Sequence, residues 1–240
     1  MTIIVKIGSG VLTRADGQLD TDSLANIAAS VMTCRANAPV ILVSSGAITC
    51  GASVFKPQDT QTTAIKQAAA AIGQSRLMAA YSQVFPVPVA QLLLTHDCFD
   101  SAEKRHNSRT TIATLLAHQV IPIINENDTV STAELNLGDN DQLASLTARL
   151  IQATHLILLT TVDGVYDATG SVISRLKLDA ASIDATEQDD RYAVSNGGMR
   201  SKLQAAYAAI QAGIPVTIAN GRQSESVMNA LLHKNGTKLW

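Results

Sequence analysis

The run HLILLTT, residues 155–161, is a short stretch whose centre is continuously apolar. Five other runs of this kind recur along the chain at roughly regular intervals: TIIVKI (2–7), VILVS (40–44), VAQLLLT (89–95), IPIIN (121–125) and PVTIA (215–219). A strand with one face in water alternates apolar and polar residues, whereas a continuous apolar run is typical of a strand covered on both faces. These runs therefore predict a mostly parallel sheet with helices on either side.

Segments with helical spacing lie between these predicted strands. We expect one helix from Asp20 or Thr21 to about Ala36, a second within 62–85, and a third that starts at Ser101. Apolar residues also recur on one helical face after GDND and after NGGMRSK, at Leu143, Leu146, Leu150, Leu203, Ala206, Tyr207 and Ile210. The alternation of strands and helices predicts the α/β class, as a three-layer α/β/α sandwich with a mostly parallel central sheet.

Two segments break this alternation. Residues 129–137 (TVSTAELNL) and 164–174 (GVYDATGSVIS) contain polar alternation and no helical face. Such patterns are typical of antiparallel excursions, so we expect both segments to be hairpins attached to the sandwich.

Composition bounds the size, location and partners of the protein. A chain of 240 residues, 46% of them apolar, can bury about 70 to 75% of its unfolded surface, so we expect one domain over 1–240. The formal net charge is -2 and no basic run occurs, so there is no electrostatic footprint for nucleic acid. Lys6 interrupts the first apolar run, and no run approaches the ~18 apolar residues of a membrane span, so we expect a cytoplasmic protein.

The cysteines and histidines show no pattern of a disulfide framework or a metal site. The three cysteines are odd in number and widely spaced, and the five histidines lack the HxxxH and HxxEH spacings. We therefore expect no protein-bound metal and interpret the histidines as isolated structural residues.

The ends of the predicted strands carry the candidate chemistry, because ligands of open α/β sheets bind beyond the carboxyl ends of the strands. After the first strand, VKIGSGVL places Lys6 close to Gly8, Ser9 and Gly10. Glycines let backbone N–H groups approach phosphate oxygens, and a lysine adds positive charge. The stretch is not a GxxxxGK[ST] loop, and by itself it is equally typical of a turn with a solvated lysine.

The second strand is followed by VSSGAI, where Ser45 and Gly46 start a helix. Hydroxyl and N–H groups at this place could hold a carboxylate or a phosphate, or they could simply cap the helix.

The fourth strand runs into NEND (125–128), and GDND (138–141) opens the helix that follows. Capping alone would explain Asp139. It does not explain the polar residues 125–128 directly after four apolar residues, where carboxylates and amides must be hydrogen-bonded or bind a ligand. We predict a ligand site there.

A last candidate is SNGGMRSK (195–202), in which two glycines lead into a helix whose first turn carries Arg200 and Lys202. The positive end of the helix dipole disfavours basic residues unless an anion is present. The pattern therefore favours a phosphate site over a solvated turn.

Taken together, the motifs resemble the glutamate 5-kinase branch of the amino acid kinase family. The resemblance rests on VKIGSGVL, VSSGAI, KQAAAAIGQSRL, PIINEND, GDNDQLAS, LILLTTVDGVYD and NGGMRSKLQAA, in this order and spacing, and runs from residue 3 to the final GTKLW. Relatives commonly have Thr-Asp where Thr160 and Thr161 stand here, although Asp163 is two residues away. Many also continue into a C-terminal PUA domain, which the printed sequence does not contain.

The resemblance implies ATP-dependent phosphorylation of the γ-carboxylate of L-glutamate, the first step of proline synthesis. It implies that Lys6, Lys202 and Asp141 are catalytic, with Asp141 orienting the two lysines, and that Mg²⁺ is bound through ATP. It also implies a homo-oligomer, either dimer or tetramer, whose product passes to a glutamyl phosphate reductase. The implied glutamate ligands are Ser45, Gly46, Asp128 and Asn140. The implied ATP-binding residues are Lys6, Gly8, Ser9, Thr160, Thr161, Asn196, Gly197, Gly198, Met199, Arg200, Ser201 and Lys202.

The chemistry agrees with this interpretation. A glutamate side chain is already ionised at pH 7, so the reaction needs charge neutralisation and no general base. An acidic residue, for which we predict Asp128, would accept from the α-ammonium. Two alternatives stay open: an enzyme of this fold acting on aspartate, acetylglutamate, carbamate or a nucleoside monophosphate, and a catalytically silent amino acid sensor. The presence of both lysines argues against the sensor, and the scarcity of arginine near the strand ends argues against a nucleotide acceptor.

Overall fold

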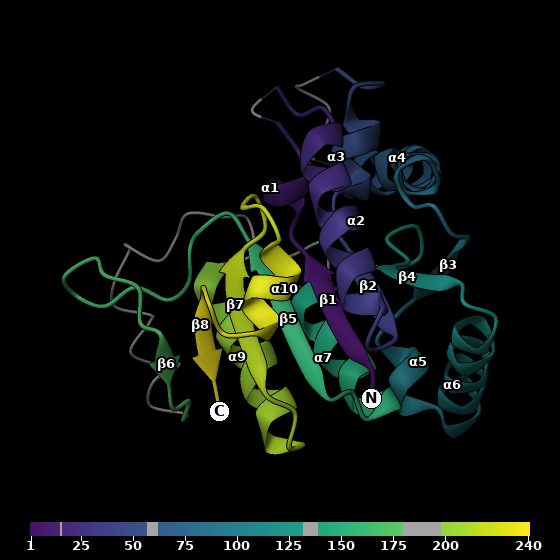
Figure 1. The fold of residues 1–240 in the computed structure, drawn as a ribbon. Coiled ribbons are helices and arrows are strands. Elements are labelled where there is room, and N and C mark those ends of the chain that lie inside the picture. The colour runs from purple at the N-terminus through teal and green to yellow at the C-terminus, as the bar shows by residue number, and fades with distance from the viewer. Residues whose placement is uncertain (15, 57–61, 132–138, 180–197) are drawn as a thin grey trace.

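The computed structural model describes residues 1–14, 16–56, 62–131, 139–179 and 198–240. The strands in these ranges form one eight-stranded sheet in the order β3-β4-β2-β1-β5-β7-β8-β6 (Figure 1). The strands are β1 (Ile3–Ile7), β2 (Val40–Ser44), β3 (Val89–Leu94), β4 (Ile121–Glu126), β5 (His155–Thr160), β6 (Arg175–Leu176), β7 (Val216–Asn220) and β8 (Thr237–Leu239). All six predicted strands are confirmed, with ends that differ by one residue at most.

The strands are apolar throughout because both faces of the sheet are covered. In β1, Ile4 packs into one core, whereas Ile3, Val5 and Ile7 pack into the other. Successive side chains of a strand point to opposite faces, so a strand between two cores needs no polar face.

Helices cover the two faces of the sheet as two layers, which confirms the predicted three-layer sandwich (Figure 1). One layer contains α5 (Asp97–Asp100), α6 (Ala102–Ala117), α7 (Asp139–Ile151) and α9 (Gly198–Gln211). The other contains α1 (Ser9–Leu12), α2 (Thr21–Arg35), α3 (Ala47–Ala52), α4 (Thr63–Val84) and α10 (Ser226–Leu231).

The predicted helix starts at Asp20 and Ser101 are confirmed by their caps, and the helix predicted within 62–85 proves to be capped by Thr62. The side chain of Asp20 accepts from the backbone N–H of Ser23 at 3.1 Å, and Thr62 and Ser101 accept in the same way from residues three further along. Each side chain satisfies an N–H group that has no partner inside the helix.

The carboxyl end of the chain departs from the parallel pattern. β8 pairs antiparallel with β7, and β6 pairs parallel with β8. No sequence pattern had predicted these two short strands. The predicted hairpin at 164–174 is confirmed, because Tyr166 and Val172 form an antiparallel bridge. The other predicted hairpin, 129–137, falls almost wholly outside the described residues.

One prediction about the histidines is wrong, since His155 and His233 are not isolated from each other. Their ring centroids lie 5.7 Å apart at the amino end of β5, and Nε2 of His155 lies 3.1 Å from Oγ1 of Thr217. The pair lies at the opposite end of the strand from Thr160, so it is remote from the strand ends that carry the candidate site.

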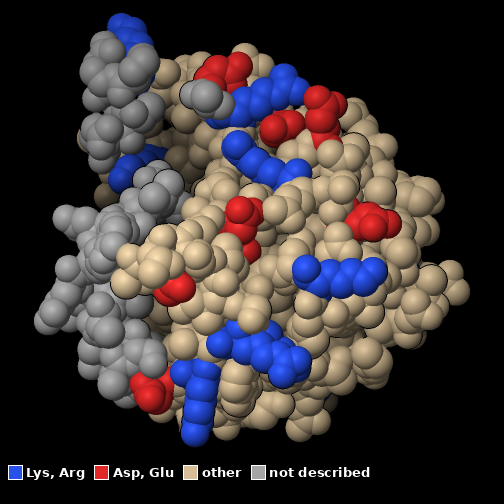
Figure 2. All heavy atoms as spheres, turned by 60° about the vertical axis from the view of Figure 1, so that its left-hand side comes forward, with Lys and Arg blue, Asp and Glu red and all other residues tan. Residues whose placement is uncertain are grey.

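The surface in view in Figure 2 is mixed in charge. Over its described part, single basic and acidic side chains are spread without merging into one large patch of either sign (Figure 2). No helix within the described ranges is both long and apolar enough to cross a membrane.

Candidate functional site

Three charged side chains lie together at the carboxyl end of the parallel strands. Lys6 comes from β1, Asp141 from the first turn of α7, and Lys202 from the second turn of α9. The ammonium nitrogen of Lys6 lies 2.8 Å from Oδ1 of Asp141, and that of Lys202 lies 3.2 Å from Oδ2. One carboxylate therefore spans two lysines that are 135 and 61 residues away from it in sequence.

All three side chains are buried, with exposed fractions of 5% for Lys6, 0% for Asp141 and 4% for Lys202. With both lysines protonated, the cluster carries a surplus positive charge inside the protein. Buried charge is costly unless it is compensated, so the cluster is suited to receive an anion.

The pKa values of two members follow from burial and from this sharing of one carboxylate. Burial lowers the pKa of Lys6, and Lys202 lowers it further, against the raising effect of Asp141. Burial by itself would raise the pKa of Asp141, but the charges of Lys6 and Lys202 outweigh it and hold that pKa below its usual value. Asp141 therefore stays ionised as the fixed centre between the lysines.

The loops after β1 and β5 lie against each other beside this cluster. The backbone N–H of Gly8 donates to the carbonyl of Leu159 at 3.0 Å. A Cβ atom on Gly10 would lie 3.1 Å from Cγ2 of Thr161. The tertiary structure thus brings the predicted nucleotide residues Gly8, Ser9, Thr160 and Thr161 to neighbouring strand ends.

The start of α9 supplies the remaining predicted nucleotide residues. Gly198 has a φ of 53°, a left-handed value that favours glycine. Met199 is buried, Arg200 is exposed, Ser201 is half-buried and Lys202 points into the charged cluster. Asn196 and Gly197 lie outside the described residues.

Sequence reasoning named Asp163 but missed the polar group that it forms beside the predicted nucleotide residues. Oδ1 of Asp163 accepts from Nδ2 of Asn220 at 2.9 Å and from Nε2 of Gln223 at 2.8 Å. The guanidinium of Arg222 donates to the carbonyls of Gly10 and Thr13. The signal that could have found this group is NGRQ (220–223), a polar run directly after a predicted strand.

The loop after β2 holds Ser45 and Gly46, the predicted acceptor-side residues. Gly46 has a φ of 96°, a backbone conformation that residues other than glycine rarely adopt. The chain turns at this residue and enters α3. The side chain of Ser44 is held in place by a hydrogen bond, because its hydroxyl lies 2.8 Å from the hydroxyl of Tyr81 on α4.

The end of β4 brings the two acidic motifs together. Asp128 lies half-buried in the turn after β4, and Asn140 lies in the first turn of α7. Oδ1 of Asn140 accepts from the backbone N–H of Glu126 at 3.2 Å. Because Asp141 follows Asn140 directly, the predicted acceptor side adjoins the lysine cluster.

The residues at this end of β4 are more deeply buried than the sequence had predicted. Asn125 and Glu126 belong to the strand itself, with exposed fractions of 1% and 2%. Nδ2 of Asn125 donates to Oε1 of Gln74 on α4 at 2.8 Å. Sequence reasoning did not single out Gln74.

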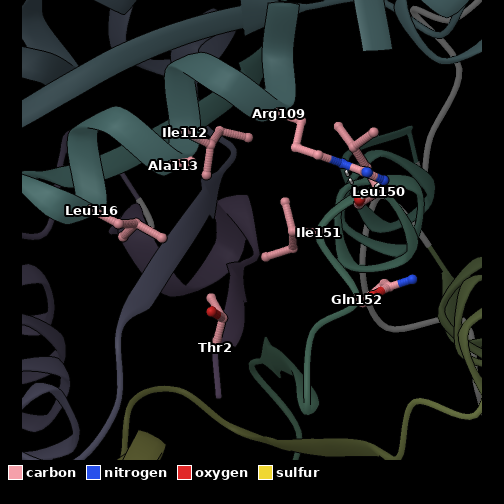
Figure 3. Close-up of a pocket in the computed structure, with 8 residues that line it drawn as sticks. All are labelled: Thr2, Arg109, Ile112, Ala113, Leu116, Leu150, Ile151 and Gln152. Atoms are coloured by element: carbon pink, nitrogen blue, oxygen red, sulfur yellow. Dashed lines mark hydrogen bonds between the residues drawn. The ribbon is translucent and has the colours of Figure 1, made fainter. Parts of the chain in front are cut away.

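A cavity of about 240 Å³ lies elsewhere, between α6, α7 and the start of β1 (Figure 3). Arg109 reaches across it and donates to the carbonyl of Leu150 through Nε and Nη2, at 3.1 and 2.7 Å. The walls are mostly apolar, from Ile112, Leu116 and Ile151 among others. The cavity lies at the amino end of the strands and does not coincide with the charged cluster.

The chain forms an α/β sandwich with a buried Lys-Asp-Lys cluster at the carboxyl ends of its parallel strands. Solved structures of similar fold include a carbamate kinase from Giardia lamblia bound to AMP-PNP, with a TM-score of 0.69 and 18% identity over 99% of this chain and 98% of that one. A UMP kinase from Ureaplasma parvum has a TM-score of 0.64 and 15% identity over 99% and 98%. At these identities the likeness establishes the fold alone.

The sequence comparisons define the family. The model of the amino acid kinase family matches residues 1–220, so the chain belongs to this family. Similar curated proteins include the glutamate 5-kinase of Geobacter sulfurreducens, 42% identical over 242 residues, and that of Geobacillus kaustophilus, 42% identical over 243 residues. These alignments cover 95% and 97% of this chain but 64% and 65% of the relatives, so the chain spans less than two thirds of their length.

Proposed function

We propose that this chain transfers the γ-phosphoryl group of ATP to the γ-carboxylate of L-glutamate, giving L-glutamyl 5-phosphate and ADP as the first step of proline synthesis. The observation that carries the proposal is the buried cluster of Lys6, Asp141 and Lys202 at the carboxyl end of the parallel strands. The identity to curated glutamate 5-kinases supports the choice of acceptor.

The proposed reaction is limited by repulsion between two anions. A γ-carboxylate oxygen of glutamate attacks the γ-phosphorus of ATP, the bond to the β,γ-bridging oxygen breaks, and ADP leaves with the electron pair. The acceptor is already ionised at pH 7, so no residue has to remove a proton. The barrier therefore falls when positive charge is held where negative charge concentrates in the transition state.

The cluster supplies that charge in a fixed place. Lys6 and Lys202 come from different layers of the fold, and Asp141 holds one on each carboxylate oxygen. We assign both lysines to the transferring phosphoryl group and Asp141 to positioning them. Preorganised charge of this kind costs no reorganisation during the reaction.

The remaining assignments divide the site into two sides. Gly8, Ser9, Thr160, Thr161, and the residues from Asn196 to Lys202 are assigned to ATP. Ser45, Gly46, Asp128 and Asn140 are assigned to glutamate, with Asp128 accepting from the α-ammonium. Mg²⁺ enters the proposal as part of the nucleotide: bound with ATP, it would neutralise part of the charge of the phosphates, and no described residue is assigned to it.

The proposal treats residues 1–240 as one amino acid kinase domain that acts as a homo-oligomer, dimer or tetramer, in the cytoplasm. Strands from Ile3 to Leu239 in one sheet support the single domain. Native mass in solution tests the assembly. An acyl phosphate hydrolyses readily, so the next reaction must consume it by reduction, and transfer to a glutamyl phosphate reductase belongs to the same proposal.

The test is an ATP-dependent assay that traps the acyl phosphate with hydroxylamine, alongside a coupled measurement of ADP release. Acceptors are L-glutamate, L-aspartate, N-acetyl-L-glutamate, carbamate and UMP, with Lys202→Met as the control for a contaminating kinase. We expect L-glutamate to exceed every other acceptor in kcat/KM by at least about 100-fold. A higher kcat/KM for another acceptor would identify a different kinase. If glutamate bound but neither hydroxamate nor ADP were formed, the protein would be a sensor.

A further inference from the structure

A row of three side-chain amides runs from α4 to α7 across the end of β4. Gln74 is buried on α4, with an exposed fraction of 8%, and Asn125 is buried at 1% on β4. Nδ2 of Asn125 donates to Oε1 of Gln74 at 2.8 Å, and Oδ1 of Asn125 accepts from the backbone N–H of Glu126 at 2.9 Å. The same N–H lies 3.2 Å from Oδ1 of Asn140.

One backbone N–H group determines which way every amide in this row points. A backbone nitrogen can only donate, so the atoms of Asn125 and Asn140 that face Glu126 must be oxygens. The far end of Asn125 is then its amino group, which also only donates, and so the atom of Gln74 that faces it must be Oε1. The orientations of all three amides therefore follow from a fixed donor.

Two amino groups are left at the ends of this row. The amino group of Asn140 points away from the backbone of Glu126. Nε2 of Gln74 is buried and has no hydrogen-bond partner among the described residues. A buried donor without a partner is unfavourable, so this amino group is available to a water molecule or a ligand.

The position of Gln74 is fixed by an unusually close contact between two helices. Its neighbour Gly73 faces α3, where an added Cβ atom would lie 1.8 Å from the carbonyl oxygen of Ala47. Ala47 follows Ser45 and Gly46, the loop assigned to the acceptor side. Gln74 is therefore held between the loop after β2 and the end of β4.

We propose that Gln74 is a positioning residue of the amino acid pocket: by holding Asn125 it keeps the end of β4 in place, and the N–H of Glu126 in that segment keeps Asn140 with its amino group toward a carboxylate of the acceptor. This inference rests on the proposed function for the identity of the acceptor. Carboxylates accept only, so a pocket for an acidic amino acid needs donors that cannot turn over to present oxygen. The N–H of Glu126 supplies this restriction for Asn140, and Gln74 helps to hold that N–H in place from α4.

The experiment compares Gln74→Met and Gln74→Glu with Gln83→Met as the matched control. Methionine keeps the length of the side chain and removes both hydrogen-bonding ends, glutamate keeps an oxygen facing Asn125, and Gln83 is exposed on the same helix. We expect Gln74→Met to raise the KM for L-glutamate at least about 10-fold, with kcat and the KM for ATP within about twofold. Gln74→Glu should recover part of the loss only as its carboxyl group becomes protonated, because the ionised form would bury a negative charge near the acceptor, and Gln83→Met should match the unchanged protein.

A second measurement needs no turnover. Amide hydrogen exchange at Glu126, followed by NMR, should be at least about 10-fold faster in Gln74→Met than in the unchanged protein or in Gln83→Met. If the unchanged protein phosphorylated no amino acid, the proposed function would fail, and this exchange rate alone would decide whether Gln74 holds the row. Unchanged exchange, or equal increases in both KM values, would overturn the inference.

Discussion

At the scale of single residues, the site depends on one aspartate that serves two lysines. Each lysine would be costly to bury alone, and Asp141 makes it tolerable to bury both. With both lysines protonated, one carboxylate does not balance their two charges, and the phosphoryl group of the proposed reaction would do so. The contributions of Lys6 and Lys202 to the proposed reaction should therefore appear in turnover rather than in binding of the amino acid.

We predict that Lys202→Met lowers kcat by about 10² to 10³, because it removes one preorganised charge from the transition state. The KM for glutamate should change far less. Lys6→Met should behave in the same way, and the double variant should lose less than the product of the two effects, since both act on one phosphoryl group. Steady-state kinetics measure this, with the exposed Lys234→Met as control. A normal kcat with only a weaker KM for ATP would reduce Lys202 to a nucleotide ligand.

A second prediction concerns Asp128, assigned to the ammonium of glutamate. Asp128→Ala should raise the KM for glutamate by about 10- to 150-fold, the loss of a charge-assisted contact worth about 1.5 to 3 kcal/mol, and leave the KM for ATP nearly unchanged. Glutarate, which lacks the ammonium, should be a poor substrate of the unchanged protein and be penalised less in the variant. Equal weakening of both substrates would contradict the assignment.

A third prediction concerns His155, far from the site. Burial, with smaller effects of His233 and Lys238, lowers the pKa of His155 from 6.5 to about 4. In the unfolded chain His155 binds a proton below about pH 6.5, whereas in the folded chain it does so only near pH 4. The free energy of unfolding should therefore fall as pH falls through this window, by up to about 1.4 kcal/mol per pH unit from this residue.

Urea denaturation at several pH values between 7 and 4 measures the slope. His155→Gln, which can still bond to Thr217, should flatten it, and the exposed His106→Gln should not. A slope that is the same in all three proteins would show that His155 does not titrate in this window.

At the scale of the elements, the acceptor side depends on how closely α3 and α4 approach. Gly51 and Gly73 face each other's helix, and a Cβ atom on either would come within 2 Å of a carbonyl oxygen. Backbone atoms cannot swing aside as a flexible side chain can. The glycines therefore set the place of α4, and with it the places of Gln74 and Tyr81.

We predict that Gly73→Ala destabilises the protein by at least about 3 kcal/mol, although alanine is the better helix former by about 1 kcal/mol. The overlap with the carbonyl of Ala47 must push α3 and α4 apart. Thermal and urea denaturation measure the loss, with Ser75→Ala on the exposed face of α4 as a near-neutral control. A variant as stable as the unchanged protein would mean that this contact can relax.

At the scale of the whole molecule, the sheet is completed by the end of the chain. β8 inserts between β7 and β6, Leu239 is fully buried, and Thr237 accepts from the N–H of Val165 at 2.8 Å through its hydroxyl. The insertion covers an edge of β7 that would otherwise be open to pairing with another chain.

We predict that ending the chain after Gly236 costs more than about 3 kcal/mol and promotes aggregation, because it removes a buried leucine and three residues of pairing along β7. Melting temperature and light scattering measure the two effects. Removing Trp240 alone should cost much less, since its side chain is half exposed. A truncated chain with the original melting temperature would show that β8 is dispensable.

The amino acid sequence by itself determined the central sheet and most of its helices. Continuous apolar runs are distinctive because only strands covered on both faces need them, and Asp20, Thr62 and Ser101 mark helix starts because an unpaired N–H group needs an acceptor. The strand-end motifs also predicted which segments carry Lys6, Ser45, Asp128, Asp141 and Lys202, because these residues lie at the carboxyl ends of strands, in the turns after them or near the starts of helices.

Only the tertiary structure decided what these residues contact. The sequence could not place Gln74, since a glutamine at the spacing of Ala70, Leu77 and Tyr81 matches an ordinary helix face until Asn125 is found opposite it. β6 and β8 are too short to give a pattern, and they form because β7 offers an edge to β8, which in turn pairs with β6. The tertiary structure likewise decided that Asp141 is shared by two lysines. Lys202 and Lys6 lie 61 and 135 residues from it in sequence, and such contacts depend on how the layers pack and not on local spacing.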